Sequence, residues 1–69
     1  MILDHAEMKE RESYHKILVA TSRTALSVYL QNKENIDPTV IRYQRDLVKM
    51  YESNLKTFYK ENGMDKNGE

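Results

Sequence analysis

Residues 16–30 read KILVATSRTALSVYL and form the most apolar stretch of a chain of 69 residues. Small hydroxyl residues lie between the large side chains, and no other segment has a strand pattern that could pair with this one. We therefore expect a helix. At 100° per residue, the large side chains of this helix fall on two sides instead of one.

The two sides of this helix lead to different predictions. We expect the larger side to pack on the rest of the same chain, and its members are Tyr14, Ile17, Leu18, Thr21, Ala25, Val28 and Tyr29. The second side consists of Val19, Leu26 and Leu30, with Ser22 between the two sides. One neighbouring helix covers only one side, so the second side is predicted to contact another chain. The alternative is that these three apolar residues are ordinary surface residues.

The first helix is predicted to span about residues 4–31. Asp4 and Glu7 have the spacing of a capping box, which satisfies free backbone N–H groups at a helix start. Further along, Glu12 and Lys16 have the i, i+4 spacing that favours an ion pair on the helix surface.

The second helix is predicted to span about residues 38–61. Asp37 is a good N-cap, and Pro38 suits the first helical position because its missing N–H costs nothing there. Gly63 marks the end of the helix. The apolar residues with helical spacing, which we expect in the core, are Val40, Leu47, Val48, Tyr51, Leu55 and Phe58.

The predicted fold class is all-α: an antiparallel αα-hairpin in a single domain over residues 1–69. Residues 32–37 form the loop, and residues 62–69 form a flexible tail. A core of this size rarely supplies more than about 3–5 kcal/mol, and the chain has no cysteine that could add a disulfide. We therefore expect a homodimer of hairpins that forms a four-helix bundle.

Composition limits the classes of function. Eleven basic and eleven acidic residues cancel, so net charge favours neither a nucleic-acid nor a membrane partner. The first residues lack the basic and apolar regions that are typical of a signal peptide, and no apolar run reaches the roughly 18–20 residues that a membrane span needs, so we expect a cytoplasmic protein. His5 and His15 are ten positions apart and do not form a ligand pair, so no metal or cofactor is expected.

Two surfaces are candidates for binding. The predicted protein interface consists of Val19, Ser22, Leu26 and Leu30 on the first helix and Tyr43 and Met50 on the second. A basic stripe follows one side of the second helix for roughly 27 Å, and its members are Arg42, Arg45, Lys49, Lys56 and Lys60. The stripe suits phosphates or an acidic protein surface, but a solvated face that pairs with Asp46 and Glu52 is the alternative.

No catalytic site is expected. The stretch DPTVIRYQRDLV at 37–48 resembles the start of the second helix in a family of aspartyl-phosphate phosphatases, whose signature has serine, glutamine and aspartate. Gln44, Arg45 and Val48 occupy those three places, so the acidic residue is missing and the resemblance does not imply the activity. In architecture, the chain is similar to small plasmid RNA-binding hairpins that dimerise into four-helix bundles.

The sequence therefore predicts a small non-enzymatic protein-interaction module, of a kind frequent among bacterial and phage regulatory proteins. It would dimerise or dock on a target protein and would bind no small-molecule substrate. The alternative is a nucleic-acid-binding hairpin that uses the basic stripe.

Overall fold

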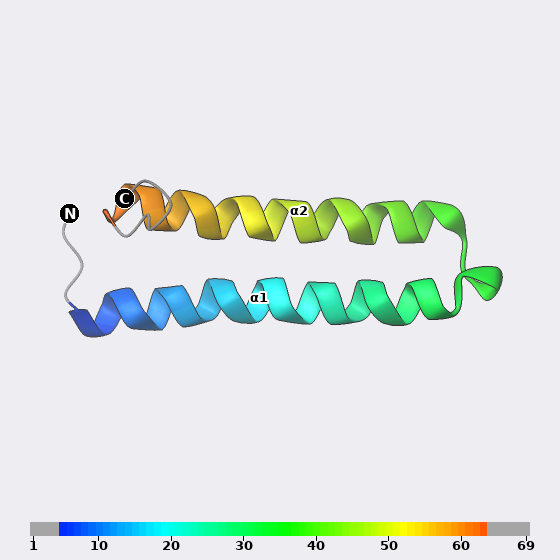
Figure 1. The fold of residues 1–69 in the computed structure, drawn as a ribbon, viewed down its shortest axis with the longest axis horizontal. Coiled ribbons are helices and arrows are strands. Elements are labelled where there is room, and N and C mark those ends of the chain that lie inside the picture. The colour runs from blue at the N-terminus through cyan, green and yellow to red at the C-terminus, as the bar shows by residue number, and fades with distance from the viewer. Residues whose placement is uncertain (1–4, 64–69) are drawn as a thin grey trace.

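The computed structural model describes residues 5–63, which form two long helices that lie side by side and run in opposite directions (Figure 1). Helix α1 spans His5–Gln31, and helix α2 spans Pro38–Glu61. The predicted αα-hairpin is confirmed for these residues, and neither described helix has a stretch long and apolar enough to cross a bilayer. The segment between them contains one short 3₁₀ turn, η1, over Lys33–Asn35, where a plain polar loop was predicted.

Both ends of α2 are capped by local hydrogen bonds, as the sequence predicts. The Asp37 side chain accepts a hydrogen bond of 2.8 Å from the backbone N–H of Thr39, and Pro38 occupies the first turn. At the other end, Gly63 has a φ of +67°, a value that favours glycine because it has no Cβ. Its N–H donates to the carbonyl oxygen of Lys60 at 3.4 Å, which satisfies a free carbonyl of the last turn.

Some predictions fall on other parts of the chain. Asp4, the predicted N-cap of α1, and positions 64–69 of the predicted tail lie outside the described residues.

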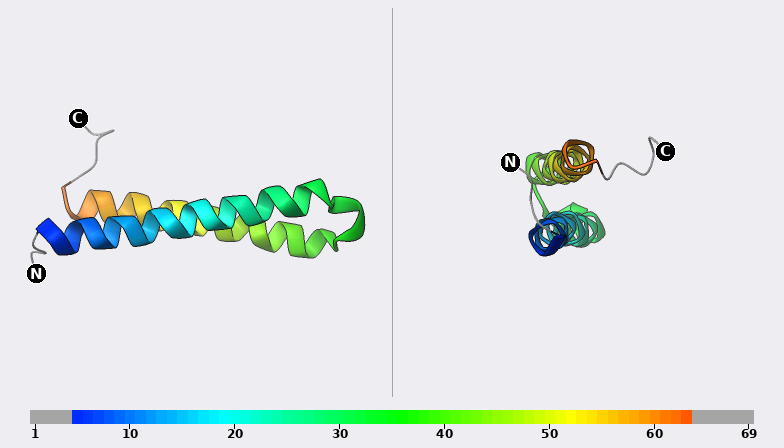
Figure 2. Two further views of the ribbon diagram at one scale, coloured as in Figure 1. Left: turned by 90° about the horizontal axis from the view of Figure 1, so that it is seen from below. Right: turned by 90° about the vertical axis from the view of Figure 1, so that its left-hand side faces the viewer.

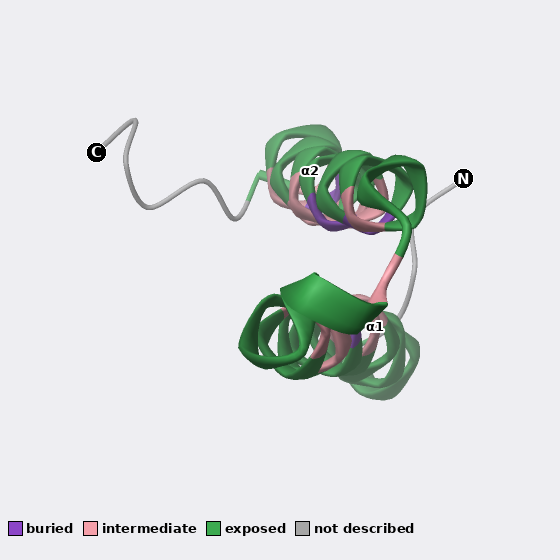
Figure 3. Cartoon of the chain, turned by 90° about the vertical axis from the view of Figure 1, so that its right-hand side faces the viewer, coloured by how far each residue is buried: buried purple, intermediate pink, exposed green. Residues whose placement is uncertain are grey.

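The contact between the helices, here called the seam, follows the sides of α1 and α2 that face each other, where the buried and half-buried residues gather (Figure 3). Leu18, Ala25 and Leu47 are half-buried beside its central line. On α1 the seam consists of Met8, Glu12, His15, Val19, Ser22, Leu26 and Tyr29. On α2 it consists of Ile41, Gln44, Val48, Tyr51, Leu55 and Phe58. Steps of four and three residues alternate along both lines, which is the spacing of helices that pack at a shallow crossing angle, and Figure 2 shows that crossing.

The seam gives the hairpin only a thin core. Val19, Val48 and Phe58 are its buried apolar residues, with 6–7% of each exposed. Among the described residues no side chain is fully buried. The reason is geometric, because each helix of a pair has one neighbour and its other sides face outward. A stable domain usually consists of at least two packed layers, and this hairpin supplies one.

The predicted assignment of the two sides of α1 is wrong in part. Leu18, Ala25 and Tyr29 of the larger side are half-buried, as expected, and Leu30 of the second side is exposed. Val19 and Ser22 are buried in the seam and Leu26 is half-buried, so α2 covers the side that was predicted to stay free. Tyr14 and Ile17, which were expected to pack on α2, are each 61% exposed.

The predicted stripe of α2 is correct in part. Val48 and Phe58 are buried, and Tyr51 and Leu55 are half-buried in the seam. Val40 is 44% exposed, in contrast to the prediction.

Polar residues explain why α1 turns its less bulky side toward α2. The amide Nε2 of Gln44 donates a hydrogen bond of 3.0 Å to the backbone carbonyl of Ser22, and both residues are buried. The Ser22 hydroxyl donates to the carbonyl of Val19 at 3.0 Å, so the serine fills little space and leaves no polar atom unsatisfied. The rings of His15 and Phe58 are 5.3 Å apart. Because these contacts are polar or aromatic, the apolar periodicity of the sequence does not indicate them.

Candidate protein-binding site

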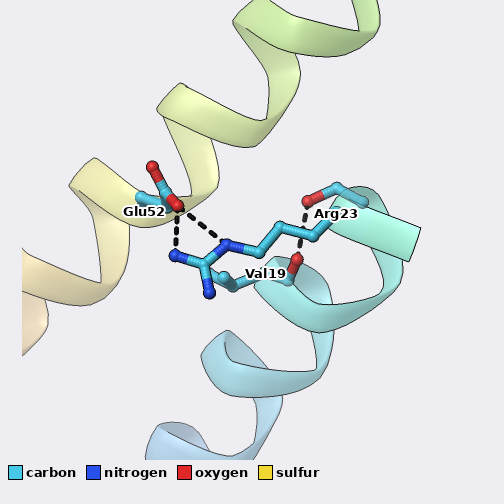
Figure 4. Close-up of polar contacts among 4 residues, drawn as sticks. Val19, Arg23 and Glu52 are labelled. Atoms are coloured by element: carbon cyan, nitrogen blue, oxygen red, sulfur yellow. Dashed lines mark hydrogen bonds and ion pairs between the residues drawn. The ribbon is translucent and has the colours of Figure 1, made fainter. Parts of the chain in front are cut away.

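One side of the helix pair carries charged residues that bridge the two helices. We call it the charged face, and its groove of about 530 Å³ is lined by Lys16, Val19, Ala20, Arg23, Glu52, Leu55, Lys56 and Tyr59. Figure 4 shows the Arg23 side chain of α1 extended toward Glu52 of α2. Its Nε donates to the Glu52 carboxylate at 2.9 Å, and one terminal nitrogen contacts the same oxygen. On this face the two helices are therefore joined by a two-pronged ion pair.

A second polar bridge lies further along the charged face. The Tyr59 hydroxyl of α2 donates a hydrogen bond of 2.7 Å to the Glu12 carboxylate of α1. Lys16 contacts the same carboxylate at 3.3 Å, which confirms the predicted i, i+4 pair. Burial raises the pKa of Tyr59 above its usual value, and the hydrogen bond and the negative charge of Glu12 act in the same direction.

The opposite side of the helix pair is apolar. Its exposed residues, which we call the apolar face, are Tyr14, Ile17, Thr21 and Val28 on α1 and Tyr43 and Met50 on α2. At 100° per residue, the four α1 members lie about 100–180° around the helix from Lys16 and Arg23. The two α2 members lie about 120–180° from Glu52 and Lys56. Since those four charged residues line one groove, both groups of apolar residues lie away from it. Ile17 is about 160–180° from the seam residues Val19 and Leu26, so it lies at the outer edge of the apolar face.

The large side chains of the apolar face are about half exposed or more. Tyr43 is 66% exposed, Tyr14 and Ile17 are 61% exposed, and Val28 and Met50 are 48% exposed. Between positions 17 and 31 the only charged residue of α1 is Arg23, which contacts Glu52 on the charged face. On α2 the exposed Asp46 lies one turn from both Tyr43 and Met50, and on α1 Glu10 and Arg11 lie beside Tyr14. Exposed apolar residues that cluster and are bordered by polar ones are typical of a surface that binds another protein.

The predicted interface residues do not lie on a common surface. Val19 and Ser22 belong to the seam and are covered by α2. Leu26 is half-buried, and Leu30 is 40% exposed beside it in a furrow that also includes Arg23, on the charged side. Tyr43 and Met50 do lie on the apolar face. One signal in the sequence could have distinguished the seam from the free surface. Steps of three and four residues alternate without a break along the seam only if polar positions such as Ser22 are included.

The basic stripe is exposed along its whole length. All five members, Arg42, Arg45, Lys49, Lys56 and Lys60, are exposed on α2. Glu52 was a predicted partner for the stripe, but it contacts Arg23 across the hairpin instead. Within residues 5–63, none of the five takes part in an ion pair. The five cations are therefore exposed to solvent, with Asp46 as a neighbour of Arg42 and Lys49 along the helix.

The described residues offer little to a metal ion, because they contain no group of three or more histidine, aspartate or glutamate side chains arranged to hold one. In the groove of the charged face, Lys16, Arg23 and Glu52 are already in ion pairs.

Comparison of the chain with known protein families, with curated proteins and with solved structures finds no match. Function is therefore inferred from the geometry of the surfaces.

Proposed function

We propose that this chain is a cytoplasmic, non-enzymatic protein–protein interaction module that binds another polypeptide through its apolar face. The observation that carries the proposal is the cluster of six exposed residues on one side of the helix pair, five of them large and apolar. A hairpin that leaves two tyrosines and an isoleucine more than half exposed gains free energy when a partner removes this surface from water. Tyrosine and methionine are also enriched where proteins meet.

A matched pair of variants tests this proposal. Ile17→Asp with Val28→Asp places two negative charges on the apolar face, whereas Ala20→Asp with Ser27→Asp places the same charges at exposed positions elsewhere on α1. We expect the first variant to lose association, measured by sedimentation and by affinity capture from extracts of the native host. The second variant should keep it. Equal association of both variants with all partners would refute the proposal.

A second candidate function is nucleic-acid binding through the basic stripe, favoured by the absence of ion pairs from its five exposed members within the described chain. Such binding weakens steeply as salt rises, because phosphate contacts release counterions. Charge reversal of Arg45, Lys49 and Lys56 to glutamate should abolish salt-dependent binding to a generic RNA or DNA duplex. Reversal of Lys9, Arg11 and Lys33 is the control with an equal change of charge. Binding that survives the first reversal would exclude this candidate.

A further inference from the structure

The apolar face repeats one pattern on both helices. Two triplets with a spacing of seven residues carry it: Tyr14, Thr21 and Val28 on α1, and Tyr43, Met50 and Thr57 on α2. In each triplet a tyrosine lies two turns before the central residue, and a smaller β-branched residue lies two turns after it. Thr57 is exposed and borders a furrow between the helices away from the charged groove, so it extends the same face.

The two triplets lie at the same level along the long axis of the hairpin. The Arg23–Glu52 and Glu12–Tyr59 contacts fix the register of α1 against α2. This register places Thr21 within about one turn of Met50 along the axis. Because the helices are antiparallel, each tyrosine is then level with the small end residue of the other helix.

Resting on the proposed function, we infer that the occupant of the apolar face is a second copy of this chain, with the loops of both copies at the same end. The two-fold axis runs parallel to the helices, so α1 of each copy lies on α2 of the other. Every bulky side chain then meets a smaller one. Tyr14 packs on Thr57 of the second copy, Tyr43 packs on Val28, and Met50 packs on Thr21.

The area of the face agrees with a dimer. Helix α1 has 27 residues and is therefore about 40 Å long, and two helices side by side are about 20 Å wide. One side of the pair thus offers roughly 800 Å², which is about what each partner contributes to a stable interface of standard size. Two stacked hairpins also supply the second layer that one hairpin lacks.

The dimer with loops at opposite ends fits less well. It would place Thr21 against Thr21 and Met50 against Met50, so that two small residues leave a gap beside two large ones. It would also stack α2 on α2 and bring the two basic stripes to the same side of the bundle, where their charges repel. With the loops at the same end, the stripes lie on opposite sides.

Cysteine cross-linking distinguishes the arrangements, because the natural chain has no cysteine. Thr21→Cys and Met50→Cys are prepared as separate variants, mixed, denatured, refolded together and oxidised. We expect a disulfide-linked dimer in the mixture, in up to about half of the protein because random pairing gives that share of mixed dimers. Each variant alone should stay uncross-linked. Ala20→Cys mixed with Ser53→Cys, both exposed away from the apolar face, is the control.

The other outcomes overturn the inference in separate ways. Cross-linking of each variant with itself would show the dimer with loops at opposite ends. A wild-type chain that sediments as a monomer at high micromolar concentration would exclude any homodimer. The proposed function would survive that result if affinity capture still depended on Ile17 and Val28, and it would fail if capture did not.

Discussion

The charged face and the apolar face are built from the same two helices, but their residues have opposite relations to the fold. On the charged face, Arg23 contacts Glu52 and Tyr59 contacts Glu12, so each pair joins α1 to α2. On the apolar face, Tyr14 and Tyr43 are more than 60% exposed. The charged face adds polar contacts between α1 and α2, whereas the apolar face contributes when another polypeptide covers it. Substitutions on the charged face should therefore change the stability of the hairpin, and substitutions on the apolar face should change its association with another polypeptide.

The largest expected effect comes from a charge in the seam. Val19→Asp buries a carboxylate without a partner, which costs several kcal/mol and exceeds what so small a core supplies. We expect circular dichroism to show no cooperative thermal unfolding at any protein concentration.

Ile17→Asp is the matched control on the apolar face. Its exposed position leaves the seam intact, so we expect a cooperative transition whose midpoint no longer depends on protein concentration. If both variants unfolded alike, the distinction between seam and apolar face would be wrong.

The next effect concerns the buried amide. Gln44→Ala removes the hydrogen bond to Ser22 and leaves a cavity, so the free energy of unfolding should fall by about 1–2 kcal/mol. Gln44→Leu fills most of the same space with an apolar side chain and should change the stability by less than about 1 kcal/mol. Urea titration of both variants measures these values. A greater loss for leucine than for alanine would contradict this role for Gln44.

A smaller effect is expected on the charged face at high pH. The pKa of Tyr59 is raised in the folded state, so the protonated hydroxyl stabilises the fold, and this contribution disappears as pH rises through the raised pKa. Tyr59→Phe should lower the stability at neutral pH by about 1 kcal/mol and should remove this part of the alkaline destabilisation.

Ultraviolet titration checks the cause of the pKa shift. Glu12→Gln removes the negative charge beside the hydroxyl, so the pKa of Tyr59 should fall toward its usual value. An unchanged titration curve would show that the Glu12 carboxylate does not act on Tyr59.

The smallest effect belongs to the Arg23–Glu52 pair, whose side chains are 62% and 39% exposed. A double-mutant cycle with Arg23→Ala and Glu52→Ala should give an interaction of about 0.2–1 kcal/mol, weaker at high salt. A coupling near zero at low salt would show that the groove side of the hairpin relies on apolar packing.

The local features of the fold could be read from the amino-acid sequence. The Asp37 side chain and Pro38 start α2 within a few residues of chain, and Gly63 ends it in the same local way. The strong apolar period of Val48, Leu55 and Phe58 identifies the side of α2 that lies in the seam. Helix caps and apolar periodicity depend on neighbours along the chain, which is why both helices were predictable. Their antiparallel pairing was predictable because the loop between them is short.

The side of α1 that faces α2 was decided by contacts between distant residues. Both sides of α1 are apolar enough to pack on a helix, so hydrophobicity does not choose between them. The choice depends on whether Gln44 finds the Ser22 carbonyl, whether Tyr59 reaches Glu12, and whether His15 fits against Phe58. These pairs are 22 to 47 residues apart along the chain, and only the packed helices bring them within contact distance.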